Sequence, residues 1–377
     1  MKVYKRAPDG NNRKRALFLF PTDRMGGAER VTRMIAREAA LNDDFDHIYC
    51  FVLSQANTGT LDDFTAFRNV TLHYTGAQNE RGGLLTLIRV LMSDRFDFVF
   101  SSHTHINALC SLLRRLGMLR VSRLVAREST LIFERDFGYN GPFIRALYRL
   151  YGAQDVIVCQ TERMQQSLNK HTNNRLAAKS VVIANPIDLA RIEMAKGEST
   201  HVLDHIPAAA TKIVWCGRLV PIKAPIRAIE TLRALHDIGK PDAHLIMIGD
   251  GPLAGDVRDA IRRLQLNHHV TLCGYQSNPL AIMARCDLGL LTSDMEGFPN
   301  VILEMLAAGV RRVVTTNCSG GLGTIPRVRV ATDFSPNMLA QCLIEELTEA
   351  GPDVISRFLM SRSPCAFLTR IYEEELY

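Results

Sequence analysis

Two glutamates that lie eight residues apart, Glu296 and Glu304, could both bind a ligand that is rich in hydroxyl groups. They belong to the string S-D-M-E-G-F-P-N-V-I-L-E-M-L-A-A-G at residues 293–309. A carboxylate accepts hydrogen bonds from vicinal hydroxyls. A nucleoside diphosphate sugar carries hydroxyls at both ends, on its ribose and on its hexose. The pair therefore suits such a ligand, whereas a single glutamate of this kind is more often a solvated surface acid.

The residues around this string predict a strand, a turn and a helix. The apolar run 287–291 predicts a buried strand, and Gly297 and Pro299 then break the pattern, so that the first glutamate falls in a turn. Asn300 can cap the helix that follows, and Gly309 can end it. Both acids would then lie near the carboxyl edge of a strand, where open α/β sheets bind ligands.

Two further loops contain residues that suit a phosphate group. Gly26 and Gly27 follow an apolar run and open a helical pattern. Paired glycines let the backbone approach a ligand closely, and the N-terminus of a helix accepts phosphate. After a second apolar run, Arg218 as a planar fork and Lys223 as a point charge can clamp a diphosphate. Each loop alone could also be an ordinary turn or a pair of exposed basic residues.

Taken together, these strings resemble the retaining glycosyltransferases of the GT-B fold, family 4. The family's first loop, diphosphate segment and E-x₇-E motif are similar to G-G-A-E-R at 26–30, G-R-L-V-P-I-K at 217–223 and E-G-F-P-N-V-I-L-E at 296–304. The resemblance implies an α/β protein with two Rossmann-like domains that face an interdomain cleft. It implies an acceptor-binding domain, a nucleotide-sugar-binding domain and a helix returning to the first domain, at residues 1–188, 189–355 and 356–377.

The resemblance also implies roles for individual residues. Glu304 would bind the ribose hydroxyls and Glu296 the sugar hydroxyls, while Arg218 and Lys223 would bind the diphosphate. The remaining donor contacts would come from the backbone of Gly26, Gly27, Gly297, Phe298, Pro299 and Asn300. His103 follows a predicted strand at 96–101 and stands where the family has an active-site histidine. A lone histidine at a strand end is more often structural, but here His103 and Glu296 are the candidate catalytic residues.

The implied chemistry needs neither a metal nor an organic cofactor. Cations and glycine amides would stabilise the charge that develops on the leaving diphosphate. A D-x-D string at 44–46 precedes a predicted strand instead of ending one, which argues against a metal role. The family picture is a front-face transfer in which the leaving phosphate accepts the acceptor's proton. From its residue type, Glu296 could also act as the nucleophile of a double displacement.

The sequence departs from the family in its last third. Residues 317–326 replace the usual P-x-G-x-x-E-I segment, and Arg311-Arg312 stands where a small residue and Pro-Val are common. Ala224 and Pro225 likewise follow the diphosphate segment where glycine is common. The donor sugar therefore stays open. A UDP-linked hexose or N-acetylhexosamine is the first expectation, and GDP-mannose is the second.

Size and composition favour a two-domain enzyme in a reducing compartment. The chain has 377 residues, of which 47% are hydrophobic and 22% charged, as in ordinary soluble proteins. No apolar run reaches the ~18 residues that span a bilayer. Residues 1–15 lack the apolar core of a signal peptide. The nine cysteines form no C-x-x-C pair, so we expect neither a zinc site nor disulfides, and a cytoplasmic location. Residues 189–210 read as an interdomain linker.

The first half of the chain is basic, which suggests an anionic partner. Residues 1–185 contain 26 Lys and Arg against 17 Asp and Glu. Three apolar stretches carry arginines, at 84–92, 109–124 and 143–151, and the second includes Arg114, Arg115, Arg120 and Arg123. Each could be a core helix, but together they predict helices facing an anionic membrane, at the inner face of the cytoplasmic membrane. The acceptor would then be a saccharide or lipid-linked saccharide in the synthesis of polysaccharide, lipopolysaccharide or another glycan.

Three other function classes fit part of the sequence. A nucleotide-sugar epimerase or hydrolase would share the two-domain architecture. A non-catalytic protein that binds anionic lipid or nucleic acid would explain the basic half, but its cations are not interleaved with aromatic residues in any RNA-binding motif, and the two glutamates would have no role. We therefore expect no nucleic-acid partner. An NAD oxidoreductase would need the G-x-G-x-x-G fingerprint, which is absent.

Overall fold

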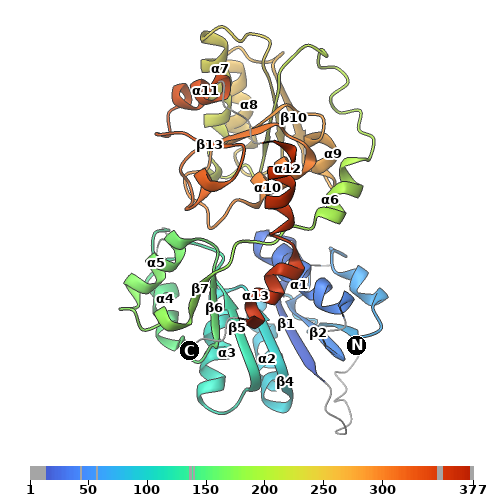
Figure 1. The fold of residues 1–377 in the computed structure, drawn as a ribbon, viewed down its shortest axis with the longest axis vertical. Helices are drawn as coiled ribbons and strands as arrows, with labels where there is room; N and C mark the ends of the chain where they lie inside the picture. Colours follow the sequence, from blue (N-terminus) through green and yellow to red (C-terminus); the bar gives the residue numbers. More distant parts are fainter. Residues whose placement is uncertain are drawn as a thin grey trace. The chain divides into compact units, whose positions relative to one another are not determined.

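The computed structural model describes residues 14–42, 45–56, 58–135, 138, 141–345 and 351–373. Residue contacts divide the chain into two compact units (Figure 1). Unit 1 comprises Met1–Pro186 and Pro364–Tyr377, and unit 2 comprises Ile187–Ser363. Both units are α/β, and each is built on a parallel sheet. The α/β prediction is therefore confirmed.

Unit 1 contains a seven-stranded parallel sheet in the order β3-β2-β1-β4-β5-β6-β7. Its strands are β1 (Arg15–Thr22), β2 (His47–Ser54), β3 (Val70–Tyr74), β4 (Arg95–Ser101), β5 (Arg120–Arg127), β6 (Val156–Cys159) and β7 (Ser180–Val182). The strand order reverses between β1 and β4, which are neighbours in the sheet. In an open parallel sheet such a reversal leaves a crevice at the carboxyl ends of the strands, so the loops after β1 and β4 can share one site.

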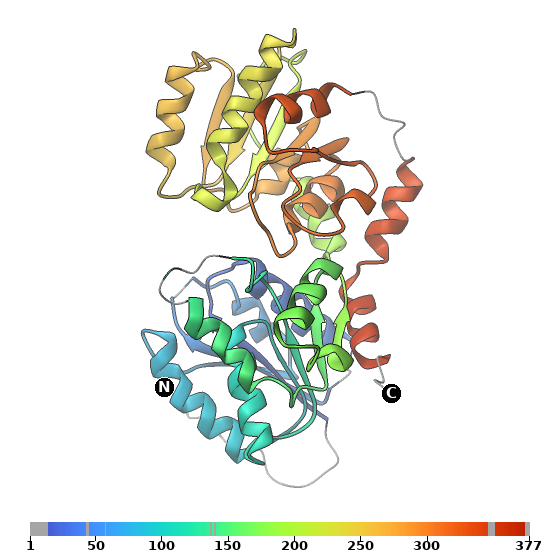
Figure 2. The same ribbon diagram turned by 90° about the vertical axis from the view of Figure 1, so that its left-hand side faces the viewer.

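Helices cover both faces of the unit 1 sheet. They are α1 (Gly27–Leu41), α2 (Glu80–Ser93), α3 (Thr104–Arg115), α4 (Gly141–Ala146), α5 (Glu162–His171) and α13 (Pro364–Glu373). Because successive strand residues point to opposite faces, Phe18 packs in the core with Ile35 and Ile371, whereas Leu19 packs in the core with Leu91 and Ile106. Figure 2 shows α13 (red) on the side of the sheet away from α2 and α3 (cyan).

Unit 2 contains a six-stranded parallel sheet in the order β10-β9-β8-β11-β12-β13. The strands are β8 (Lys212–Cys216), β9 (His244–Ile248), β10 (Val270–Gly274), β11 (Leu288–Leu291), β12 (Arg312–Thr315) and β13 (Val328–Val330). The helices are α6 (Leu189–Lys196), α7 (Pro225–Asp237), α8 (Ala254–Arg263), α9 (Pro279–Met283), α10 (Asn300–Ala308), α11 (Pro336–Ile344) and α12 (Pro352–Met360). Here too the strand order reverses, between β8 and β11.

The structure corrects two predictions about local structure. Residues 189–210 are not a linker, because they contain α6 and bury Ile192, Leu203 and Ile206 in the core of unit 2. Residues 109–124 are not one helix either. They comprise the end of α3, a turn in which Gly117 has a φ of +70°, and the start of β5. In the described ranges, no helix combines the length and apolar character needed to cross a membrane.

Candidate functional site

The sheet of unit 2 brings the two predicted donor loops together. β8 and β11 pair directly, with Ile213 opposite Leu288, so the loops that follow them leave the same sheet edge side by side. Thr292 joins the loops, since its hydroxyl contacts the carbonyl oxygens of Lys223 and Ala224 at 3.0 and 2.9 Å. These bonds fix the backbone at Lys223 against the turn that carries Glu296.

Lys223 and Glu296 meet at this edge. The Lys223 ammonium forms an ion pair with Glu296 Oε1, and the Ser293 hydroxyl donates to the same oxygen at 2.8 Å. Both side chains are largely buried, with 22% and 14% of their surface exposed. The backbone is held as well, because the Asp294 N–H donates to the Ile222 carbonyl at 2.9 Å. A cation and a carboxylate that the sequence predicts to contact different parts of a ligand thus form an ion pair at this edge.

The residues after Glu296 form a turn that leads into α10. Phe298 is 9% exposed, and the guanidinium of Arg362 lies over its ring at 5.4 Å and over the Phe358 ring at 4.5 Å. Pro299 occupies the N-cap position without a side-chain hydrogen bond, so Asn300 is the first helical residue and not the predicted cap. Glu304 follows one turn further along α10 and is half-buried.

Arg218 lies in the loop after β8 and is exposed. Within the described part of the chain, its side chain forms no hydrogen bond or ion pair, so the guanidinium can reach a ligand. The loop itself is tightly packed. Gly249 has a φ of +133°, and a Cβ there would lie 1.9 Å from the Gly217 carbonyl oxygen, so only glycine fits. The Leu219 N–H also donates to the Asp250 carbonyl at 3.0 Å.

The atypical segment 317–326 packs against the donor turn. The Glu296 N–H donates to the Cys318 carbonyl at 2.8 Å, and the Ser319 hydroxyl donates to the Gly297 carbonyl at 2.7 Å. Within the segment, the side chains of Leu322 and Ile325 are buried. The departure from the family pattern therefore lies directly beside the predicted sugar-binding residues, where it can affect the choice of donor.

In unit 1, the structure brings Gly26, Gly27 and His103 to one sheet edge. Gly26 is the N-cap of α1, which follows β1, and His103 is the N-cap of α3, which follows β4. β1 and β4 are paired, with Leu19 opposite Ser101. Gly27 is exposed, and a Cβ there would meet nothing within 4 Å, so its backbone is open to a ligand.

Sequence reasoning missed the charged residues beneath these loops. His103 Nε2 lies 3.1 Å from Glu29 Oε1, and Glu29 is 8% exposed. Burial would raise the pKa of Glu29, but the hydrogen bond and charge of His103 and the N–H groups of Glu29 and Gly26 hold it below its usual value. The string G-G-A-E-R contained this residue, but a partner 74 positions away in the sequence leaves no local signal.

Arg127 is a second charged residue that the sequence did not single out. It ends β5, is 1% exposed, and donates from Nη2 to Asn185 Oδ1. Its Nε and Nη1 atoms are buried and have no hydrogen-bond partner among the described residues. Burial lowers the pKa of Arg127 to about 9, against the opposing effect of Glu128 and Glu29, so the guanidinium is still protonated at neutral pH.

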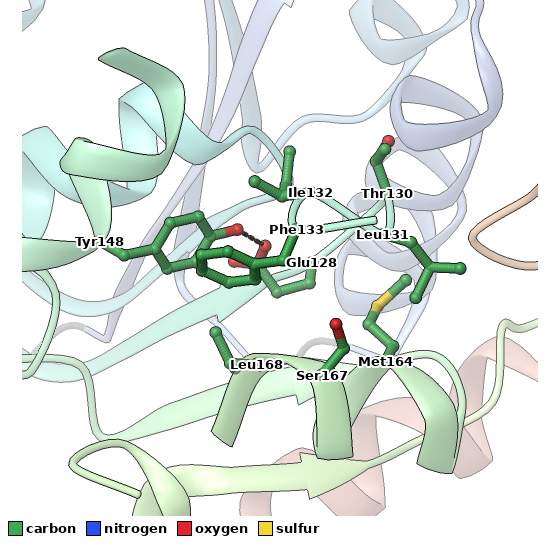
Figure 3. Close-up of a pocket in the computed structure, with 9 residues that line it drawn as sticks. All are labelled: Glu128, Thr130, Leu131, Ile132, Phe133, Tyr148, Met164, Ser167 and Leu168. Carbon is green, nitrogen blue, oxygen red and sulfur yellow. Dashed lines mark hydrogen bonds between the residues drawn. The ribbon is translucent and has the colours of Figure 1, made fainter. Parts of the chain in front are cut away.

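A small pocket lies beyond β5, and none of the predicted site residues lines it (Figure 3). It is lined by Glu128, Thr130, Leu131, Ile132, Phe133, Tyr148, Met164, Ser167 and Leu168. The hydroxyls of Tyr148 and Tyr151 both donate to the Glu128 carboxyl, and burial raises the pKa of that carboxyl. Because Glu128 holds two tyrosines of the neighbouring segment, its role here is structural.

The arginines predicted to face a membrane mostly bind the protein itself. Arg114 pairs with Asp155 and donates to the Ala153 carbonyl at 2.9 Å. Arg115 donates to the Leu150 and Tyr151 carbonyls at 3.0 and 2.8 Å, and Arg123 donates to the Ile371 carbonyl. The prediction that this stretch is a membrane-facing helix is therefore wrong, because its arginines join α3 and β5 to neighbouring segments.

The D-x-D string could not be placed as a unit, because Asp44 lies outside the described residues. Asp46 accepts a hydrogen bond from the Lys14 N–H at 2.7 Å just before β2. Among the side chains that the structure does describe, no three or more His, Cys, Asp or Glu residues form a group that could hold a metal ion.

Comparison with known proteins adds three findings. Residues 210–348 match the family model described as glycosyl transferases group 1. An uncharacterized glycosyltransferase of Methanocaldococcus jannaschii is 22% identical over 62% of this chain and 59% of its own length. The N-acetylgalactosamine-N,N'-diacetylbacillosaminyl-diphospho-undecaprenol 4-alpha-N-acetylgalactosaminyltransferase of Campylobacter jejuni is 32% identical over 38% of this chain and 36% of its own length.

The alignments thus span less than two thirds of either relative. Among solved structures, Anabaena Alr3699/HepE in complex with UDP superposes with a TM-score of 0.73. It is 18% identical and covers 95% of this chain and 98% of its own. At this identity the likeness establishes the fold.

Proposed function

We propose that the protein is a retaining glycosyltransferase, because residues 210–348 match the group 1 glycosyl transferase model and the chain has the GT-B fold. It moves a hexose or N-acetylhexosamine from a nucleotide sugar, most simply a UDP-sugar, to a saccharide or lipid-linked saccharide. The product belongs to a cell-surface polysaccharide, a lipopolysaccharide or another glycan. The observation that carries the proposal is the Lys223–Glu296 pair at the carboxyl edge of β8 and β11.

Unit 2 supplies the donor contacts in this proposal. Lys223 and the exposed Arg218 neutralise the diphosphate, and Glu296 accepts hydrogen bonds from the sugar hydroxyls. Glu304 accepts hydrogen bonds from the ribose, one turn into α10. The backbone from Gly297 to Asn300 borders the sugar, and the exposed Gly27 of unit 1 offers an N–H to the diphosphate.

The reaction is a single group transfer. The acceptor oxygen forms a bond to the anomeric carbon while the bond from that carbon to the β-phosphate oxygen breaks. The acceptor proton passes to the leaving phosphate oxygen, so the products are a glycoside and a nucleoside diphosphate. Lys223 and Arg218 stabilise the charge on the leaving group, which lets the transfer proceed without a divalent metal. His103 is the catalytic residue proposed on the acceptor side.

Two relatives support the choice of substrates. HepE was solved with UDP, which fits a uridine nucleotide as the carrier. The Campylobacter jejuni relative acts on a diphospho-undecaprenol saccharide, which fits a lipid-linked acceptor.

A lipid-linked acceptor suits a protein that binds the membrane at its cytoplasmic face, and α2 offers a surface for this. Arg81, Leu85, Arg89 and Met92 lie on its outer side, opposite the buried Leu87 and Leu91. Leu85 and Met92 are 65% and 42% exposed. Arginine can then contact lipid phosphate while the apolar side chains enter the acyl region.

A thermal-shift panel of nucleotide sugars, followed by product analysis, tests the proposed function. A ligand at 100 times its Kd adds ~2.7 kcal/mol of stability, so a donor that binds raises the melting temperature of the protein. The stabilising donor is then incubated with saccharide acceptors, with and without EDTA. Nucleoside diphosphate released only when acceptor is present supports transfer, and an α-linked product from an α-linked donor supports retention. Release without acceptor indicates a hydrolase, a converted donor sugar indicates an epimerase, and the absence of any stabilising nucleotide rejects the proposal.

A further inference from the structure

Glu29 lies in the first turn of α1, close to the N-cap residue of that helix. It is the third residue of α1, and its carboxylate turns back toward Gly26, the N-cap. The position resembles that of the acid in a capping box, in which the third helical residue reaches back to the N-cap, although here the Gly26 N–H donates to the Arg24 carbonyl at 3.1 Å. A Cβ on Gly26 would lie 2.6 Å from Glu29 Oε2, so glycine at this position leaves room for the returning carboxylate. Gly27 is left open beside it.

The same carboxylate holds His103. Glu29 Oε1 lies 3.1 Å from His103 Nε2, while His103 Nδ1 is buried and has no hydrogen-bond partner in the described ranges. A carboxylate can only accept, so the neutral imidazole carries its proton on Nε2. A proton on Nδ1 would be a buried donor without an acceptor, which is costly. The contact therefore fixes both the tautomer and the ring orientation.

Other charged groups surround this pair. Arg127 is the buried last residue of β5, and the charges of Glu128 and Glu29 favour its protonated form. From α2 and α3, Glu80 and His105 form a second glutamate–histidine pair at 3.2 Å. The His103 and His105 rings lie 6.2 Å apart. Glu80 and His105 are 44% and 38% exposed, so water screens that pair more than the pair at Glu29.

We propose that Glu29 is a positioning residue that holds the His103 imidazole in one tautomer and one orientation. The role of His103 in the transfer rests on the proposed function, whereas the orientation of the His103 ring by Glu29 is independent of it. One side chain thereby joins the exposed glycine loop, which would meet the donor diphosphate, to the histidine on the neighbouring strand end.

The consequence is a specific kinetic signature. Substrate binding by unit 2 does not involve Glu29, whereas a misplaced His103 affects the reacting centre. Misplacement of a reacting group by about 1 Å can cost about 100-fold in rate. Glu29→Gln and Glu29→Ala should therefore lower kcat by about 10- to 100-fold and change the donor KM much less. His103→Ala should lower kcat by a similar factor, and combining it with Glu29→Ala should add little.

The test uses the full chain with ¹⁵N-labelled histidine and two readouts. Ring nitrogen shifts report the tautomer of His103, assigned by the loss of its signals in His103→Ala. We expect the Nε2–H form in the wild type and a mixture of tautomers in Glu29→Ala. The matched control is Glu80→Gln, which breaks the neighbouring pair at His105 and should change neither the His103 tautomer nor kcat. Gly26→Ala, whose new methyl group displaces the Glu29 carboxylate, should reproduce the tautomer mixture.

The outcomes separate this inference from the proposed function. A His103 tautomer that is unchanged in Glu29→Ala overturns the inference, whether or not the protein transfers a sugar. An altered tautomer with unchanged kcat supports the positioning of His103 by Glu29 and rejects the role of His103 in the transfer. Failure of the wild type to bind any nucleotide rejects the proposed function alone. A lower kcat together with a mixture of His103 tautomers in the Glu29 variants, with nucleotide affinity retained, supports the proposal.

Discussion

Lys223 and Glu296 neutralise each other at the carboxyl edge of unit 2, although in the proposed complex they contact different parts of the donor. The pair joins the loop after β8 to the turn after β11, and Ser293 adds a hydrogen bond to the same carboxylate oxygen. Both charges are therefore held in position before the ligand arrives, and less side-chain entropy is lost on binding. The donor must then compete for Lys223, or share it with Glu296.

Substitution of each residue should show which part of the donor that residue contacts. Lys223→Gln should weaken binding of both UDP and the UDP-sugar, since a charge-assisted hydrogen bond of ~1.5–3 kcal/mol corresponds to about 10- to 150-fold in affinity. Glu296→Gln should weaken the UDP-sugar only, and UDP should bind at least as tightly because Lys223 loses its competitor. Calorimetric titration measures both, with Lys240→Gln, an exposed lysine near the end of α7, as the control. Weaker UDP binding by Glu296→Gln would contradict the assignment.

Glu304→Gln should weaken nucleotide binding without unfolding unit 2. The residue is half-buried on α10, and the proposed ribose contact loses its charge in the variant. The same ~1.5–3 kcal/mol gives a drop of about 10- to 150-fold in affinity for UDP. Titration with UDP and with free sugar provides the measurement, and unfolding by urea checks the fold. Unchanged affinity for UDP would remove Glu304 from the site.

The stability of unit 2 should fall in mild acid because of His244. This histidine is 5% exposed and lies 2.8 Å from the Thr271 hydroxyl. Burial, and then the charges of His205, His269, Lys212 and His236, lower the pKa of His244 from 6.5 to about 4. Between these values the unfolded chain binds a proton that the folded unit does not, so the free energy of unfolding decreases as the pH falls through this window.

Urea unfolding at neutral pH and at about pH 5 measures this effect. His244→Gln should show a smaller difference between the two conditions than the wild type. His201→Gln serves as the control, because His201 is 90% exposed and pairs with Asp204 at the surface. An equal pH dependence in the wild type and His244→Gln would show that other groups cause the acid sensitivity.

Binding to anionic vesicles should depend on α2. Each basic residue near an anionic surface adds ~1 kcal/mol, so Arg81→Gln with Arg89→Gln should lower the affinity by about 30-fold. Salt should weaken the wild-type interaction, because charges are screened within ~8 Å at physiological ionic strength. Arg258→Gln with Arg263→Gln on α8 is the matched control in unit 2. Co-sedimentation that is equal with anionic and neutral vesicles would reject the membrane proposal.

The strands of the fold were largely predictable, and the reason is local. β4 and β11 match the predicted runs 96–101 and 287–291 to within one residue, because buried parallel strands are short apolar runs bounded by glycine or polar turns. β13 was not predicted. Its three residues, Val328–Val330, are half-buried and include Arg329, so no apolar run marks it.

Predictions failed where distant partners decide the structure. An apolar, arginine-rich pattern continues from α3 through Gly117 into β5, so periodicity alone did not separate the helix from the strand. The arginines of this stretch bind carbonyl groups and Asp155, which are 35 or more positions away in the sequence. The same holds in the candidate site. The loops of Lys223 and Glu296 could be recognised from their residues, but their ion pair spans 73 positions and required the strand order.

The position of α13 affects the order in which the protein can fold during synthesis. Phe367, Leu368 and Ile371 complete the core on the α1 face of unit 1, yet the ribosome adds them only after the whole of unit 2. At ~5–20 residues per second, unit 1 waits about 10–35 s with that apolar face uncovered. During this interval the nascent chain is a substrate for chaperones, and Phe45 and Phe98 lack the ring of Tyr372 that later packs against them. A chain truncated before Pro364 could not cover this face at all. Loss of α13 would therefore destabilise unit 1, although that unit is synthesised first.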